Sequence, residues 1–152
     1  MIFLLRHGCT NSCLIKDKSI NNDVSLNDSG ILQIKLAAEK LKDITFDLII
    51  SSPTIRTNET AKLIDNKCKI IIDRRILNKN LNIQSYEQDL KSFLRDLHEL
   101  TFENLLIVTH GRIIKMIHSI IINNHIDTNF IDNIELDYGS LYLMSNNSCT
   151  KV

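Results

Sequence analysis

The sequence predicts an α/β protein with three layers, in which a mainly parallel sheet carries helices on both faces. Short apolar runs alternate along the chain with longer amphipathic segments. The runs are bounded by polar residues, which is typical of strands buried on both faces. The 152 residues fit one domain spanning 1–152, because domains commonly contain about 100–200 residues and no linker or repeat divides this chain.

The strand predictions rest on runs that are rich in Ile, Leu and Val. Near the C-terminus, two further runs flank the turn-forming stretch Tyr138-Gly139-Ser140 and predict a terminal hairpin. The predicted strands are Ile2–Leu5, Phe46–Ile50, Lys69–Ile72 and Leu105–Thr109, followed by a hairpin of Ile134–Leu136 and Leu141–Met144.

The helix predictions rest on apolar residues that recur at helical spacing between these runs. Asn27 or Ser29 is the predicted N-cap of the first helix. Ser52 and Pro53 are predicted as the N-cap and the first position of the second, because proline lacks only a donor that the first turn leaves free. The apolar stripes lie within Ile31–Leu41, Leu90–Leu100 and Ile113–Ile121.

Charge and hydropathy exclude two classes of partner. Lys and Arg number 18, as do Asp and Glu, so the formal net charge is zero and no long-range field favours nucleic acid or an anionic membrane. The longest apolar stretch, Ile113–Ile122, contains Lys115 and His118 and is shorter than the roughly 18 residues that a membrane span needs. We therefore expect no nucleic-acid partner and no membrane partner.

The N-terminus and the cysteines predict the compartment. The apolar start ends at Leu5, before Arg6, and is too short for the core of a signal peptide. Without a secretory segment, the four cysteines are expected to be free thiols rather than a disulfide framework. The expected location is the cytoplasm.

Polar and charged residues directly follow three of the predicted strands. Arg6-His7-Gly8 follows the first strand, Arg56 lies shortly after the second, and His110-Gly111-Arg112 follows the fourth. In a parallel sheet the ligand lies beyond the carboxyl ends of the strands, so two histidines and two arginines are expected to meet there. The glycine after each histidine lets a ligand approach the backbone closely.

These four side chains suit a phosphoryl group. The guanidinium groups of Arg6 and Arg56 match phosphate oxygens bidentately, and the first turn of a helix around Arg56 favours an anion. A neutral imidazole, with an ordinary pKa of roughly 6.5, can attack phosphorus and form a covalent intermediate. A second imidazole, if protonated in the complex, would donate to the oxygens that gain charge in the transition state.

Four motifs carry a family resemblance. They are Leu5-Arg6-His7-Gly8, Ser25-Leu26-Asn27-Asp28-Ser29-Gly30, Phe46–Pro53 with Arg56, Thr60 and Ala61, and Val108-Thr109-His110-Gly111. In this order and at these spacings, from Met1 to about Ile122, they resemble the histidine phosphatase superfamily, the family of cofactor-dependent phosphoglycerate mutases and related phosphatases.

The resemblance implies a role for each matching residue. His7 would be the phosphorylated nucleophile, and Arg6, Arg56 and His110 would form the phosphate pocket. No metal and no cofactor are implied. The expected substrate-binding contributors are Gly8, Thr10, Asn11 and Gly111.

One expected residue of the family pattern is missing. The family usually carries a Glu shortly after its third strand, and this Glu protonates the leaving oxygen. Here Asn78 or Lys79 stands in its place, within Asp73–Asn82, and neither is a normal general acid at neutral pH. The alternative acids are carboxylates from other loops, namely Asp17, Asp23 and Glu87.

The two cysteines after His7 also depart from the pattern. Cys9 stands where an acidic residue or Gln is common, and Cys13 stands where the family often has a phosphate-binding Asn, which makes Asn11 the possible replacement. Together with His7 these cysteines could suggest zinc, but no second matching pair accompanies them, so small polar filler near the pocket is favoured.

The expected function is a metal-independent phosphatase that works through a phosphohistidine at His7. Its partner would be a small phosphorylated metabolite or a phosphohistidine protein, because losing an acid, typically worth about 10²–10⁴-fold, harms poor leaving groups most. The alternative is a binding protein that holds phosphate or a phosphorylated partner without turnover. Phosphoglycerate mutase activity is least favoured, since the chain lacks the insertions that cover a mutase substrate.

Overall fold

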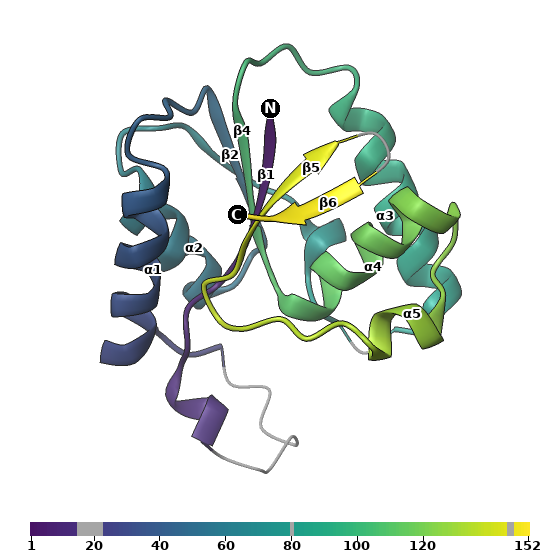
Figure 1. Ribbon diagram of the computed structural model, residues 1–152, viewed down its shortest axis with the longest axis horizontal. Coiled ribbons are helices and arrows are strands. Elements are labelled where there is room, and N and C mark those ends of the chain that lie inside the picture. Colours follow the sequence, from purple (N-terminus) through teal and green to yellow (C-terminus); the bar gives the residue numbers. More distant parts are fainter. Residues whose placement is uncertain (15–22, 80, 146–147) are drawn as a thin grey trace.

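A six-stranded sheet with helices on both faces lies at the centre of the protein and confirms the predicted α/β class (Figure 1). The computed structural model describes residues 1–14, 23–79, 81–145 and 148–152. The strands lie in the order β3-β2-β4-β1-β5-β6. Their bounds are β1 Ile2–Arg6, β2 Leu48–Ser51, β3 Ile70–Ile72, β4 Leu105–Thr109, β5 Leu141–Ser145 and β6 Ser148–Lys151.

The sheet is mainly parallel, as predicted. β1, β2, β3 and β4 run in the same direction, whereas β5 pairs antiparallel with β1, and β6 pairs antiparallel with β5. β1 and β4 are neighbours, and their register pairs Arg6 with Thr109. This register places the next residue of each strand, His7 and His110, side by side at the carboxyl edge of the sheet.

Helices pack against both faces of the sheet (Figure 1). Side chains alternate between the two cores along each strand; in β4, Leu105 and Ile107 enter one core, and Leu106 and Val108 enter the other. No helix in the described ranges is both long and apolar enough to span a membrane. One face carries α1 Asp28–Lys40 and α2 Ile55–Ile64, and the other carries α3 Ile83–Leu97, α4 Gly111–Asn123 and α5 Thr128–Asp132.

The C-terminal hairpin joins different segments from those predicted. β5 pairs with β6, and the predicted strand Ile134–Leu136 is not a strand. The chain at Leu136 is held instead at the carboxyl end of β1, where its carbonyl accepts a hydrogen bond from Arg6. A turn at Gly139, whose φ is +72°, then leads into β5.

The edge position of β3 overturns the prediction that Lys69–Ile72 is buried on both faces. β3 pairs only with β2 and ends the sheet on that side. Ile71 and Ile72 are therefore 38% and 46% exposed. An apolar run indicates a strand, but it does not reveal whether the strand has neighbours on both sides.

The predicted start of the second helix is also wrong. α2 begins at Ile55 with Thr54 as its N-cap, rather than at Pro53 with Ser52 as the cap. Ser52 instead prolongs the sheet, because its N–H donates to the carbonyl of Val108 at 3.0 Å. Its hydroxyl contacts the ring of His110 instead of capping the helix.

The N-terminus of α1 lies tightly against the segment that follows His7. Asn27, one of the two predicted caps, accepts a hydrogen bond from the Gly30 N–H at 2.8 Å. A Cβ at Gly30 would lie 2.0 Å from the carbonyl oxygen of Cys9, and a Cβ at Gly8 would lie 2.5 Å from the carbonyl oxygen of Gly30. Only glycine at both positions permits this approach, which fixes the backbone beside His7.

We expect Gly30→Ala to lower the free energy of unfolding by about 1–3 kcal/mol, the usual cost of overpacking a tight contact. Urea unfolding at neutral pH measures this difference. Ser29→Ala, at the exposed preceding position of the same helical turn, is the matched control and should change stability by less than about 0.5 kcal/mol. Equal stability of Gly30→Ala and the wild type would contradict the described contact.

Candidate active site

The rings of His7 and His110 lie against each other at the carboxyl edge of the sheet. Their centroids are 5.1 Å apart, the ring planes form an angle of 71°, and both side chains are buried. The His7 N–H donates to the carbonyl of Thr109 at 3.0 Å, which continues the pairing of β1 with β4 by one more step. The sheet itself therefore determines that the two imidazoles meet.

A backbone carbonyl fixes the tautomer of the His7 ring. Nδ1 of His7 lies 2.8 Å from the carbonyl oxygen of Gly8. A carbonyl oxygen only accepts hydrogen bonds, so Nδ1 carries the proton and donates it. In the neutral ring Nε2 then holds the lone pair, and Nε2 is the atom available for attack on phosphorus.

Ser52 orients the second imidazole. Nε2 of His110 lies 2.9 Å from the hydroxyl oxygen of Ser52, and both side chains are buried. Ser52 follows β2, and β2 lies beside β4, so the pairing of these strands brings the hydroxyl to the ring. A hydroxyl both donates and accepts, so this contact persists whether His110 is neutral or protonated.

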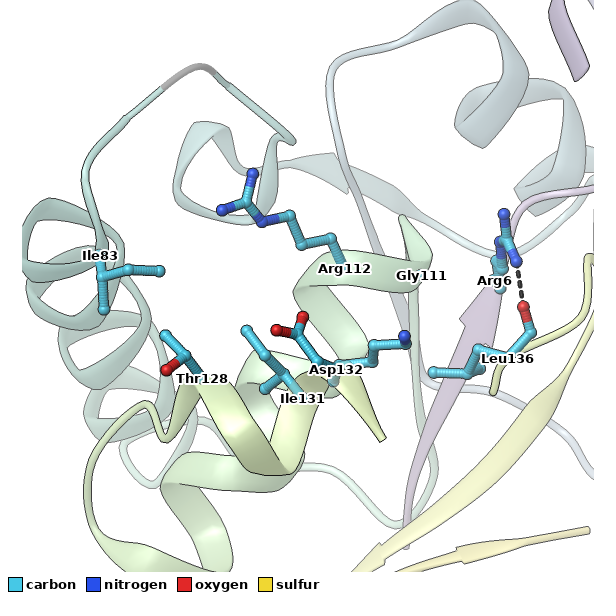
Figure 2. Close-up of a pocket in the computed structure, with 9 residues that line it drawn as sticks. Arg6, Ile83, Gly111, Arg112, Thr128, Ile131, Asp132 and Leu136 are labelled. Atoms are coloured by element: carbon cyan, nitrogen blue, oxygen red, sulfur yellow. Dashed lines mark hydrogen bonds between the residues drawn. The ribbon is translucent and has the colours of Figure 1, made fainter. Parts of the chain in front are cut away.

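Arg6 is held between the C-terminal segment and the start of α4. Its Nη1 donates to the carbonyl of Leu136 (Figure 2), and its guanidinium carbon lies 3.6 Å from the ring centroid of Tyr138. Gly111 makes room for it, because a Cβ there would lie 3.0 Å from Arg6 Nε. Within the part of the chain that the structure describes, buried Nε of Arg6 has no acceptor, and an anion would satisfy this donor.

Arg56 reaches the site from the first turn of α2. Its Nη1 lies 3.5 Å from an oxygen of Asp23, and the same oxygen accepts the N–H of Ile55 at 2.8 Å. Arg56 stands close enough to both histidines for its charge to affect their titration. Two permanent cations and two imidazoles thus surround one small region at the sheet edge.

Burial and nearby positive charge keep both imidazoles neutral. Desolvation is the largest cause, and it lowers the pKa of His7 to about 3 and the pKa of His110 to about 2. The hydrogen bond to Gly8 opposes this shift in His7, whereas Arg56 and Arg6 lower the pKa of both histidines further. A bound phosphoryl dianion has the opposite charge and would raise the pKa of His110.

The four predicted substrate-binding residues differ in their placement. Gly111 is the first residue of α4, where a helix leaves backbone N–H groups available to an anion, whereas the Gly8 N–H is already donated to a threonine hydroxyl. Thr10 is buried, with its hydroxyl oxygen 2.6 Å from that of Ser12, and Asn11 is exposed. The roles of these four residues stay predictions.

The side chains of Asn78 and Lys79, which are predicted to replace the expected acid, turn toward α3. The Tyr86 hydroxyl donates to the carbonyl of Lys79 and lies 3.3 Å from Asn78 Oδ1, and Lys79 Nζ lies 3.3 Å from a carboxylate oxygen of Asp89. Asn78 carries an amide and Lys79 an ammonium group, and that they take the place of the family's acid stays a prediction.

Two of the three alternative acids lie in the described part of the chain. Asp23 lies beside Arg56, as described above. Glu87 is held on α3, where it accepts hydrogen bonds from Lys91 at 2.7 Å and from the N–H of Ile126 at 3.0 Å. Asp17 lies outside the described residues. Of Asp23 and Glu87, only Asp23 is in contact with a predicted phosphate ligand.

The cysteines and the metal-ligating residue types form no cluster in the described ranges. Cys68 and Cys149 are free thiols, Cys9 Sγ donates to the carbonyl of Thr10 at 3.5 Å, and the side chain of Cys13 lies outside the description. Among the described residues, no three side chains of His, Cys, Asp or Glu gather closely enough to hold a metal ion.

The sequence reasoning missed Tyr138. Its ring lies against the Arg6 guanidinium and 5.6 Å from the ring of His7, so it packs beside both groups. In the sequence Tyr138 stands among turn-forming residues near the C-terminus, and no pattern marked it as part of a site. Only the return of the C-terminal segment to β1 brings it there.

The sequence also did not predict that the hydroxyls of Ser52 and Thr60 support the site. Ser52 was expected to cap a helix, and Thr60 was only part of a family motif. Thr60 Oγ1 accepts the Gly8 N–H at 3.3 Å and donates to the carbonyl of Arg56 at 2.8 Å. It therefore links the segment after His7 to the helix that carries Arg56.

We expect the free energy of unfolding to fall as the pH is lowered below about 6.5, because the unfolded chain then takes up protons that the folded site excludes. Folded pKa values of about 3 and about 2 mean that the unfolded state binds more protons throughout this window, so stability rises with pH. Each histidine contributes up to about 1.4 kcal/mol per pH unit, measurable by urea unfolding between about pH 6.5 and about pH 4.5.

His110→Asn separates this effect from the titration of other groups. The variant should lose one histidine's share of the slope, whereas His125→Asn, at an exposed position, should keep the wild-type slope. If the slopes of the wild type and His110→Asn coincided, His110 would not be a buried neutral imidazole.

Sequence comparison matches the chain to a family profile and to a curated relative. The family profile of the histidine phosphatase superfamily (branch 1) matches residues 2–82. The uncharacterized phosphatase PhoE of Bacillus subtilis (strain 168) is 34% identical over 64 residues, which cover 42% of this chain and 33% of that protein. The match thus spans about a third of the length of that curated relative.

Solved structures share the fold. The alpha-ribazole phosphatase from Shigella flexneri has a TM-score of 0.81 and 19% identity, covering 99% of this chain and 94% of its own. The phosphoserine phosphatase from Entamoeba histolytica, solved with phosphoserine, has a TM-score of 0.78 and 18% identity, covering 99% and 93%. Such identities show a common fold, whereas the family profile covers more than half of the chain, and the protein therefore belongs to the histidine phosphatase superfamily.

Proposed function

We propose that the protein is a metal-independent phosphatase that transfers the phosphoryl group of its substrate first to His7 and then to water. The observation that carries this proposal is the hydrogen bond from His7 Nδ1 to the Gly8 carbonyl, because it leaves the lone pair on Nε2. The second imidazole at 5.1 Å and the guanidinium groups of Arg6 and Arg56 support it, as does membership of the superfamily.

The two steps use groups that the site already contains. Nε2 of His7 forms a bond to phosphorus while the bond from phosphorus to the leaving oxygen breaks. Water then attacks phosphorus, the bond to nitrogen breaks, and phosphate leaves with the neutral ring restored. Arg6 and Arg56 would bind the non-reacting oxygens, and His110, protonated once the dianion has bound, would donate to the oxygens that gain charge.

The substituted acid favours substrates whose leaving group departs without a strong acid. Asn78 and Lys79 stand where the acid is expected, and Asp23 is the alternative carboxylate that lies beside Arg56. Aryl and acyl phosphates and phosphoramidates suit such a site better than simple alkyl phosphates. The substrate class we propose is a small phosphorylated metabolite or a phosphohistidine protein.

A binding protein without turnover is the second candidate. The observation that favours it is that Asn78 and Lys79, the predicted replacements of the acid, are engaged by Tyr86 and Asp89. Such a protein would hold a phosphoryl group between the same arginines and histidines and would not release a leaving group.

We expect the wild type to hydrolyse 4-nitrophenyl phosphate, whose leaving group needs no acid. His7→Ala should lower kcat by at least about 10³-fold, as expected when a nucleophile is removed. Mass spectrometry after an alkaline quench should find a phosphoryl group on His7 of the wild type, and brief acid treatment should remove it, because phosphohistidine is a phosphoramidate.

The control for this experiment is His125→Ala, which alters an exposed histidine and should keep wild-type turnover. Undiminished turnover in His7→Ala would contradict the proposed nucleophile. Calorimetric binding of inorganic phosphate by a wild type that turns over neither aryl nor acyl phosphates would favour the binding protein.

Tyr138 should act as a positioning residue for Arg6. We expect Tyr138→Ala to lower kcat/KM for 4-nitrophenyl phosphate about tenfold, since a cation–π contact of about 1–2 kcal/mol is lost beside a phosphate-binding cation. Tyr138→Phe keeps the ring and should recover most of this loss. Equal losses in both variants would show that the ring face is not what positions Arg6.

A further inference from the structure

We propose that a cavity beside Arg6 and Gly111 receives the leaving group of the substrate, and that Arg112 and Lys115 select a leaving group that carries an anionic group of its own, such as a carboxylate. This inference rests on the proposed phosphatase function. It narrows the substrate class to acidic small molecules.

The cavity adjoins the phosphoryl site directly. It measures about 490 Å³, and Arg6 and Gly111, which belong to the phosphoryl site, line its near end. In Figure 2, Ile83 and Thr128 stand at the opposite end, and Arg112 and Asp132 lie between. His7, His110 and Arg56 are not in the cavity lining, so Arg6 and Gly111 form the boundary across which a substrate with its phosphoryl group at His7 would extend into the cavity.

The lining of the cavity has an excess of positive charge. Arg6, Arg112 and Lys115 face a single carboxylate, Asp132, although the formal net charge of the whole chain is zero. In the described ranges, neither Arg112 nor Lys115 forms a salt bridge, whereas other cations such as Arg75 and Lys91 do. Arg112 and Lys115 are three residues apart on α4, so both cations extend from one side of this helix.

Arg112 is also oriented by an aromatic ring. Its guanidinium carbon lies 5.4 Å from the ring centroid of Tyr86, a buried residue of α3. Such a stacking contact holds the flat guanidinium while leaving its N–H donors available, which suits bidentate binding of a carboxylate. Arg112 is exposed, so its N–H donors are open to a ligand while its guanidinium lies beside the ring of Tyr86.

The apolar part of the lining indicates the chemical character of the rest of the leaving group. Ile83, Ile131 and Leu136 contribute hydrocarbon to the cavity, so the leaving group should have an apolar or aromatic body between its phosphoryl and anionic ends. Small-molecule pockets commonly measure about 300–1,000 Å³, and this cavity falls within that range. These features favour a small molecule over a phosphohistidine protein.

The test compares phenyl phosphate, which has no second anionic group, with 3- and 4-carboxyphenyl phosphate, which carry a carboxylate. In all three substrates the leaving group departs with little help from a general acid. The measured quantity is the preference, defined as kcat/KM for the carboxylated substrate divided by kcat/KM for phenyl phosphate. The wild type should prefer a carboxylated substrate. Arg112→Ala and Lys115→Ala should each lower the preference about threefold to fivefold, in line with a partly exposed ion pair.

Asp132→Asn provides a change of the opposite sign. Removing the single carboxylate of the lining should raise the preference about threefold, because a repulsion is lost. Lys35→Ala, an exposed cation on α1 on the other face of the sheet, is the matched control and should leave both activities unchanged. An unaltered preference in Arg112→Ala, Lys115→Ala and Asp132→Asn would overturn the inference.

Two further outcomes are distinguishable. The wild type could hydrolyse a phosphohistidine protein with a higher kcat/KM than any carboxylated substrate. If Arg112→Ala left that kcat/KM unchanged, the small-molecule substrate class would be overturned. If the wild type hydrolyses no phosphate ester, the proposed function fails, and calorimetric binding of the same compounds then tests the cavity. Tighter binding of the carboxylated compound that is lost in Arg112→Ala would support the cavity site, and equal binding would overturn it.

Discussion

The hydrogen bond from His7 Nδ1 to the carbonyl of Gly8 is the contact on which the chemistry of this site depends. It determines which nitrogen of a neutral ring holds the lone pair. The carbonyl is fixed in turn by packing, because Gly8 and Gly30 approach each other more closely than any residue with a Cβ would allow. Which nitrogen of His7 carries the proton therefore depends on the tight contact between the segment after β1 and the first turn of α1.

The electrostatics of the site follow from the same burial. Two guanidinium groups lie in it beside two imidazoles that are held neutral, so the site has an excess of positive charge in a chain of zero formal net charge. On the proposed function, a phosphoryl dianion would offset this excess and favour protonation of His110. Binding and proton uptake would then be coupled at His110, while His7 would stay neutral and able to attack.

Much of this arrangement was predictable from the sequence, because the strands could be read from their apolar runs and the polar residues at their ends were visible. The sequence did not reveal that β4 lies beside β1, and this long-range pairing is what brings His110 to His7. It also could not place Tyr138 or Leu136, since the contacts of a C-terminal segment with β1 leave no periodic pattern. The start of α2 was misplaced for a related reason, because Ser52 serves a neighbouring strand and His110 rather than its own helix.

The most direct test of the central claim is nitrogen NMR of the protein with ¹⁵N-labelled histidine at neutral pH. We predict that His7 is a neutral imidazole with its proton on Nδ1 and an unprotonated Nε2. A His7 signal from an imidazolium ion, or from the tautomer with the proton on Nε2, would contradict it.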